Sequence, residues 1–263
     1  MFLMLLSGSP AGNDREVPPG RKKPMRPGNS DGGFCPKGKQ RQRIINMKTE
    51  KGKNHKDPPK RSVLEEVGNA VTHGIGALLG IAGLVLLLLR SDTGMKLCAS
   101  LVYGICFILM FLMSCLYHGF KWGTGVKRLW RRFDYISIYL LIGGTFTPLW
   151  LLFWGGTSGI VLCIAEWTLI LAGITLIGVF GPEKARKIHM SLYVVLGWAG
   201  LVFLPKMAGS NIPLLVWTLA GGLLYTIGII PFAMKRKGAH FIWHFFVLFG
   251  AAAHWMGIRL CLY

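Results

Sequence analysis

Charged side chains are scarce in this chain of 263 residues. Asp, Glu, Lys and Arg together make up 16% of the sequence, whereas a soluble globular domain carries about a quarter. Hydrophobic residues make up 52%, and many of them form long runs without any charge, such as residues 67–89. The shortage of charge excludes an ordinary soluble domain. The long apolar runs predict a multi-pass membrane protein, because about 20 such residues span a bilayer core.

Cysteine is too sparse and too scattered to form a disulfide framework. The chain has 6 cysteines, none of them in a CxxC pair, and most lie inside apolar runs. We interpret them as small hydrophobic residues that pack between helices.

Acidic residues are few, and the resulting formal net charge is +19. Half of the 30 Lys and Arg residues precede Val63, and most of the others lie in short segments between apolar runs. Basic segments beside apolar spans are typical of the cytoplasmic face of a membrane protein. The charge therefore indicates the lipid bilayer as the partner and argues against nucleic acid.

Residues 1–62 differ in composition from the rest of the chain. They are basic, rich in Gly and Pro, and contain few large apolar residues, as in "PPGRKKPMRPGNSDGGFCPKGKQRQR". Such a segment cannot bury enough surface to fold. We predict a disordered basic tail over 1–62, or a start at Met47 instead, and a transmembrane domain over 63–263.

Seven apolar spans follow. They cover 67–89, 97–118, 134–154, 158–180, 188–205, 212–233 and 239–258. Backbone groups in lipid have no water to bond, so spans of this kind form helices. The sequence predicts an all-α membrane protein, a seven-transmembrane helix bundle.

The positions of Lys and Arg predict the orientation of the bundle. The segments 119–133, 181–187 and 234–238 hold eleven of them, and the alternate segments hold four. Because positive residues stay on the inner side, we expect a cytoplasmic N-terminus and a C-terminus outside.

Five polar residues then fall at one depth, near the inner face. Ser114 and His118 end the second span, Asp134 opens the third, and His240 and His244 open the seventh. Ionisable residues inside a membrane are costly and usually functional. Their shared depth is a second, separate indication of the predicted topology.

Helical spacing makes these residues candidates for a metal site. Residues four apart share a helix face, and two histidines so spaced can bind one ion. His240 and His244 with His118 would supply three nitrogens and leave a fourth position for water, as in catalytic zinc sites. Asp134 would orient that water or a ligand. A proton relay or a hydrogen-bonded network without metal is the alternative interpretation.

Other polar residues in the spans are less easily assigned. Glu66, Asn69 and His73 share one face at the inner end of the first helix, where they would support the site, contact a lipid head group, or cap and pack the helix. Glu166 lies inside the fourth span and requires a partner. His254 lies about 15 Å along the last helix from the histidine pair, so we expect it to pack rather than join the same ion.

The segments "EEVGNAVTHGIGALLGIAGLVLLL", "SCLYHGF", "FDYISIYLLIGGTFTPLWL" and "HFIWHFFVLFGAAAHW" resemble the hemolysin III family. These proteins are bacterial relatives of the progestin and adipoQ receptors, in a superfamily that includes alkaline ceramidases. The resemblance covers residue 63 to the end. It implies a bacterial plasma-membrane bundle with zinc near the cytoplasmic face, held by His118, His240 and His244. It further implies that Asp134 holds the zinc-associated water and that Ser114 lies beside the site.

Three functions are compatible with these observations. The first is a zinc-dependent membrane hydrolase, with Asp134 and Ser114 in the catalytic site, that acts on amide or ester bonds of a lipid substrate. The second is a pore-forming, cytolytic protein, as the family name implies, although no span shows the polar stripe that a wide aqueous pore requires. The third is a receptor or regulator with a structural zinc. We rank the hydrolase first.

Overall fold

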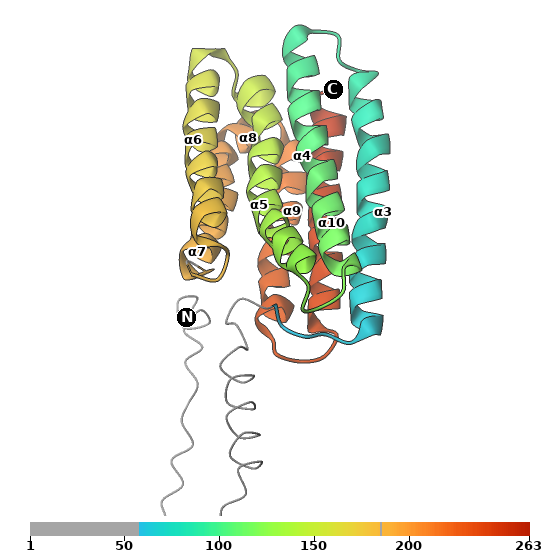
Figure 1. Ribbon diagram of the computed structural model, residues 1–263. Coiled ribbons are helices and arrows are strands. Elements are labelled where there is room, and N and C mark those ends of the chain that lie inside the picture. The colour runs from blue at the N-terminus through green and yellow to red at the C-terminus, as the bar shows by residue number, and fades with distance from the viewer. Residues whose placement is uncertain (1–57, 185) are drawn as a thin grey trace, which may run out of the picture. The chain divides into compact units, whose positions relative to one another are not determined.

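The computed structural model describes residues 58–184 and 186–263, and these residues form helices and short connections without any β-strand. The helices are α3 (Val63–Leu88), α4 (Gly94–Gly119), α5 (Gly125–Pro148), η1 (Leu149–Trp154), α6 (Gly156–Phe180), α7 (Arg186–Gly197), η2 (Ala199–Phe203), α8 (Leu204–Ser210), α9 (Ile212–Ala233) and α10 (Ala239–Cys261) (Figure 1). Residues Pro58–Tyr263 make up one compact unit. The predicted tail lies almost entirely outside the described residues, and so does the alternative start.

Seven segments in the described part of the chain are long and apolar enough to cross a membrane, which confirms the predicted all-α membrane fold. Several helices begin earlier than their apolar runs because a polar residue caps them. Ser62, Thr93, Thr124 and Asn211 each accept a hydrogen bond from the backbone N–H three residues later, which satisfies a donor that the helix itself cannot. The third span shows the largest difference: it begins at Gly125 instead of 134, because Thr124 caps it.

Prolines interrupt two of the spans. Pro148 ends α5, and the chain continues to Trp154 as the π-helix η1. The fifth span is divided into α7, η2 and α8, and Pro205 is the second residue of α8. Proline cannot donate the backbone hydrogen bond that a continuous α-helix needs.

Helix α3 packs along α4, and α4 packs along α5 (Figure 1). Two glycines allow α3 and α4 to approach closely. A Cβ atom at Gly80 would lie 2.7 Å from Phe107, and one at Gly76 would overlap the ring of Phe111. Small residues at helix contacts are the usual route to close packing in membranes. This contact fixes the position of α3 against the last turns of α4.

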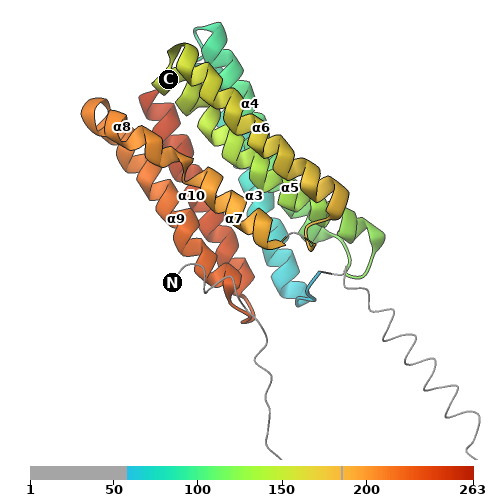
Figure 2. The same cartoon turned by 90° about the vertical axis from the view of Figure 1, so that its left-hand side faces the viewer.

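Helix α10 lies beside α9 and also contacts α3 and α5 (Figure 2). The first turns of α3 and α10 and the end of α4 therefore meet at one end of the bundle (Figure 1). The outward faces of the helices carry exposed aliphatic residues such as Leu79, Leu171 and Val216. An apolar exterior of this kind fits contact with lipid chains.

Candidate metal centre

Three histidines meet at the end of the bundle where α3 begins. His118 is in the last turn of α4, while His240 and His244 are in the first two turns of α10. Each ring offers one ligand atom, and these atoms all lie within 4.8 Å of one another. Among the described residues no other group of His, Cys, Asp or Glu meets this condition. The three histidines can therefore hold a metal ion, as their spacing predicted.

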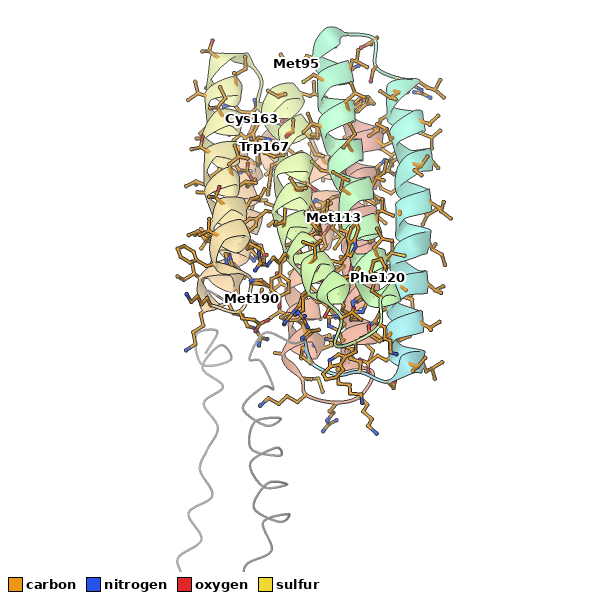
Figure 3. The ribbon with its side chains drawn as sticks, in the orientation of Figure 1. Met95, Met113, Phe120, Cys163, Trp167 and Met190 are labelled. Carbon is orange, nitrogen blue, oxygen red and sulfur yellow. The ribbon has the colours of Figure 1, made fainter. Side chains whose placement is uncertain are left out.

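The ring arrangement combines a pair within one helix and a third ring from a facing helix. The ring centroids of His240 and His244 are 4.9 Å apart, one helical turn along α10. The centroid of His118 lies 5.3 Å from that of His240 and 4.9 Å from that of His244. In Figure 3, Phe120 marks this end of α4 and Met95 marks the opposite end.

The carboxylate of Glu66 determines how His118 presents its ring. Glu66 Oε2 on α3 lies 2.6 Å from His118 Nδ1. A carboxylate accepts hydrogen bonds, so His118 Nδ1 carries the proton and Nε2 keeps its lone pair. His118 Nε2 is buried and has no hydrogen-bond partner among the described residues. An orphaned lone pair of this kind fits a metal ligand, and metal-binding histidines commonly donate their other N–H to a carboxylate.

Lys127 extends this interaction to α5. Its Nζ lies 2.9 Å from Glu66 Oε1 and 4.8 Å from the ring centroid of Tyr117, and the residue is 1% exposed. The same Nζ lies 3.5 Å from the backbone carbonyl of His118. A buried cation thus neutralises the carboxylate that orients the histidine, and three helices contribute to one polar chain.

Thr72 on α3 provides a similar contact for the second α10 histidine. Its hydroxyl donates to backbone carbonyl groups of α3, with Oγ1 2.9 Å from the oxygen of Gly68 and 3.0 Å from that of Asn69. Thr72 Oγ1 also lies 3.5 Å from His244 Nδ1. Because the only hydroxyl proton is used within α3, the oxygen can accept from His244 Nδ1–H, which leaves Nε2 with a lone pair.

Asn69 and His73 complete the α3 face of the centre. The amide nitrogen of Asn69 lies 3.4 Å from His118 Nδ1. His73 stacks on His244 with ring centroids 3.7 Å apart and an interplanar angle of 22°. Both ring nitrogens of His73 are buried without a partner among the described residues. Glu66, Asn69 and His73 of α3 therefore contact the histidine cluster, rather than only capping or packing their own helix.

Ser114 and Asp134 lie beside the cluster and are linked to each other. The Ser114 side chain forms a hydrogen bond with the Asp134 carboxylate, which is also within electrostatic range of His118. Asp134 does not belong to the set of atoms within 4.8 Å. Three histidine nitrogens can therefore bind a metal, while the Asp134 carboxylate lies near them without belonging to that group.

Two arginines border the same end of the bundle. Arg61, just before the α3 cap, lies 3.6 Å from Glu65, and Arg131 on α5 pairs with Glu183. In each guanidinium group, Nη1 is buried and has no hydrogen-bond partner among the described residues. Both groups act electrostatically on Asp134. The site thus has unused cationic donors close to its carboxylate.

The two polar residues left unassigned in the sequence lie elsewhere. Glu166 accepts a hydrogen bond from the indole N–H of Trp150, which lies in the π-helix η1. His254 stacks on Tyr225 with ring centroids 5.6 Å apart and contacts α9 at Gly221. Neither residue belongs to the histidine cluster.

Sequence reasoning overlooked Thr72 and Arg61 and treated Lys127 only as a loop charge. Lys127 is instead buried in α5, because Thr124 begins the helix well before its apolar run. The spacing of Lys127, Arg131 and Asp134, four and three residues apart, was an available signal, because a helix that began before Asp134 would place all three on one face. No local pattern, however, shows that a threonine on α3 faces a histidine on α10.

Known proteins resemble most of this chain. A family model described as "Haemolysin-III related" matches residues 61–255. Hemolysin-3 of Bacillus cereus is 37% identical over 198 residues, which cover 72% of this chain and 88% of that protein. The Hemolysin-3 homolog of Bacillus subtilis (strain 168) is 33% identical over 200 residues, or 73% of this chain and 92% of its own length. Human monocyte to macrophage differentiation factor is 28% identical over 224 residues, or 80% of this chain and 91% of that one.

Proposed function

The chain belongs to the hemolysin III family and is a multi-pass protein of the cell membrane, and on this basis we propose that it is a zinc-dependent hydrolase of lipid amide or ester bonds. The observation that carries the proposal is the three-histidine cluster, with His118 and His244 buried and His240 partly buried, whose ligand atoms lie within 4.8 Å of one another. His118, His240 and His244 would hold the ion. Three imidazole ligands suit zinc and leave a coordination position open, as catalytic zinc sites require.

Zinc, when bound, supplies a Lewis acid that activates water and polarises a carbonyl group at neutral pH. The protein contributes the geometry. Glu66 and Thr72 would fix the ring nitrogens of His118 and His244, so the site would need little rearrangement to bind its ion. Rigid ligand orientation of this kind raises metal affinity.

Asp134 would handle protons in this proposal. Its carboxylate would accept a proton from the attacking water, and the hydrogen bond with Ser114 would hold it in the orientation for that transfer. Neither Ser114 nor Asp134 belongs to the group of ligand atoms that lie within 4.8 Å of one another. The Asp134 carboxylate would therefore remain available for acid–base chemistry.

The surroundings of the site favour a lipid substrate with a hydrolysable carbonyl. Cleavage of an amide or ester releases a carboxylate, and Arg61 and Arg131, which act electrostatically on Asp134, each have an Nη1 atom without a partner among the described residues. Guanidinium groups bind carboxylates in bidentate geometry. We infer that these arginines receive the acidic product.

A pore is the competing function, since the Bacillus cereus relative is named for haemolysis. Packing along the bundle is unfavourable to that function. Among the described residues, large buried side chains such as Tyr103, Phe107, Met110 and Phe111 fill the interior between the two ends. A wide aqueous pore needs a polar lining, so a hydrolase fits the interior better than a channel.

Metal analysis and lipid turnover test the proposal. The purified protein should contain about one zinc, and the His240→Ala/His244→Ala variant should contain none. In proteoliposomes, a panel of lipid amides and esters should be hydrolysed by the wild type but not by Asp134→Asn, which should keep its zinc. Retention of zinc by the double histidine variant refutes the metal site. Dye leakage that continues after chelation supports a pore, and a zinc with four protein ligands supports a structural role.

A further inference from the structure

A groove lies at the opposite end of the bundle from the histidines, between the C-terminal ends of α3 and α10. It has a volume of about 560 Å³ and is open on one side. Arg90, which follows α3, and Arg259, in the last turn of α10, both line it. The C label in Figure 1 marks the end of α10 at this end of the bundle.

Neither guanidinium group in the groove has an ion pair or hydrogen bond with any residue that the structure describes. The acid on the adjacent loop is already engaged. Asp92 lies 3.0 Å from Lys96 Nζ, and the hydrogen bond from Lys96 lowers the pKa of the Asp92 carboxyl. Two positive charges therefore share one concave surface, and among the described residues no carboxylate lies within ion-pair distance of either.

Helix dipoles explain part of this placement. Cations are stabilised near the C-terminal end of a helix, and each arginine occupies such a position. The dipole effect acts on each helix separately, however, and does not account for two guanidinium groups on the wall of one groove. An anionic ligand would account for both.

The neighbours of the arginines indicate what kind of anion fits. Leu86 and Leu260 line the same groove and are 44% and 59% exposed, on helices whose outer faces are apolar. Trp255 packs its indole against Gly83 of α3 at the inner side of the groove, and tryptophan is enriched at membrane–water interfaces. Cationic donors beside exposed aliphatic side chains match a phosphate attached to acyl chains.

We propose that the groove between α3 and α10 binds the phosphate group of an anionic phospholipid from the leaflet at that end of the bundle. Arg90 and Arg259 each present two parallel N–H donors, which suit phosphate oxygens. Leu86 and Leu260 contact the upper part of the acyl chains. The site is separate from the histidine cluster and does not depend on the hydrolase proposal.

Lipid binding to the purified full-length protein tests this site. Affinity for phosphatidylglycerol and phosphatidylcholine is measured by native mass spectrometry after delipidation. Arg90→Gln/Arg259→Gln should lower phosphatidylglycerol affinity about ten- to thirtyfold, the factor expected for two cations at a membrane surface, while phosphatidylcholine affinity changes little. Lys235→Gln/Arg236→Gln is the matched control, because it removes two exposed charges at the other end of the bundle. This control should bind like the wild type.

Several outcomes would overturn the proposal. An equal loss in the control variant would show general electrostatic attraction instead of a site. Unchanged phosphatidylglycerol affinity in Arg90→Gln/Arg259→Gln would show that these two arginines do not bind the phosphate. Displacement of the lipid by glycerol phosphate at equal concentration would indicate a site for a free anion. Thermal unfolding and metal content, measured on every variant, show whether the groove variant remains folded. Arg90→Lys/Arg259→Lys is a milder second variant, and it should recover part of the phosphatidylglycerol affinity.

Discussion

Glu66 Oε2 lies 2.6 Å from His118 Nδ1, although 52 residues separate the two in the chain. The contact joins the first turn of α3 to the last turn of α4. It links a carboxylate that could be taken for helix capping to a histidine of the metal cluster. Several properties of the site depend on this contact and on Lys127 behind it.

Replacement of Glu66 by Gln should weaken metal binding about 10- to 100-fold, the usual effect of removing a carboxylate that orients a ligand. The amide keeps the shape but no longer fixes the proton on His118 Nδ1. Zinc affinity, measured by competition with a chromophoric chelator, checks this. Glu65→Gln is the matched control, since Glu65 pairs with Arg61 instead. Equal weakening in both variants would point to overall charge.

Substitution of Lys127 by Met should destabilise the fold by about 3 kcal/mol, because removal of one partner from a buried ion pair leaves the other charge uncompensated. Breaking a buried ion pair usually costs about 3–5 kcal/mol. We expect a loss at the lower end of these values, because Glu66 keeps His118 as a second partner. Thermal or denaturant unfolding in detergent measures the change. The double variant Lys127→Met/Glu66→Gln should be more stable than Lys127→Met alone. Additive losses would show that the two residues are not coupled.

Metal removal should lower the unfolding temperature. A ligand that binds only the folded state stabilises it by about 2.7 kcal/mol at a hundred times its Kd. Chelation should therefore shift the melt of the wild type downward, and added zinc should restore it. His240→Ala/His244→Ala should melt at one temperature under both conditions. A chelator effect that persists in this variant would place the metal elsewhere.

Trp150→Phe should destabilise the protein by about 1–3 kcal/mol, the cost of a buried acceptor that loses its donor. Glu166 would keep its position inside the bundle without the indole N–H. Trp154→Phe is the control, because Trp154 donates to Ser158 at an exposed position, 3.1 Å away. Similar losses from both changes would show that ring packing, and not the hydrogen bond, dominates.

The predicted orientation can be tested with C-terminal fusions in a bacterial host. A C-terminus outside requires that alkaline phosphatase fused after Tyr263 be active and that green fluorescent protein at the same point remain dark. We expect this orientation because the connecting segments at the opposite end of the bundle from Tyr263 carry more Lys and Arg, and such segments stay in the cytoplasm. Fluorescence together with an inactive phosphatase would reverse the topology and place the histidine cluster at the outer face.

The sequence by itself determined the membrane class, the number of spans and the depth of the histidines. Hydropathy over about 20 residues is a local property, and alternation of spans then fixes which ends share a face. The four-residue spacing of His240 and His244 placed them on one side of a helix before any packing was known. Span ends were less accurate where a cap such as Thr124 extends a helix beyond its apolar run.

Only the tertiary structure decided how each helix is rotated about its axis and which neighbour it meets. The contact of Glu66 with His118, the burial of Lys127 and the groove shared by Arg90 and Arg259 all follow from that rotation. Glycines on α3 set how closely α3 and α4 pack, and this depends on side chains far apart in the chain. The local sequence of an apolar span does not determine such pairings. Most faces of the span are apolar enough to contact lipid, so hydropathy does not select which face turns toward a neighbouring helix.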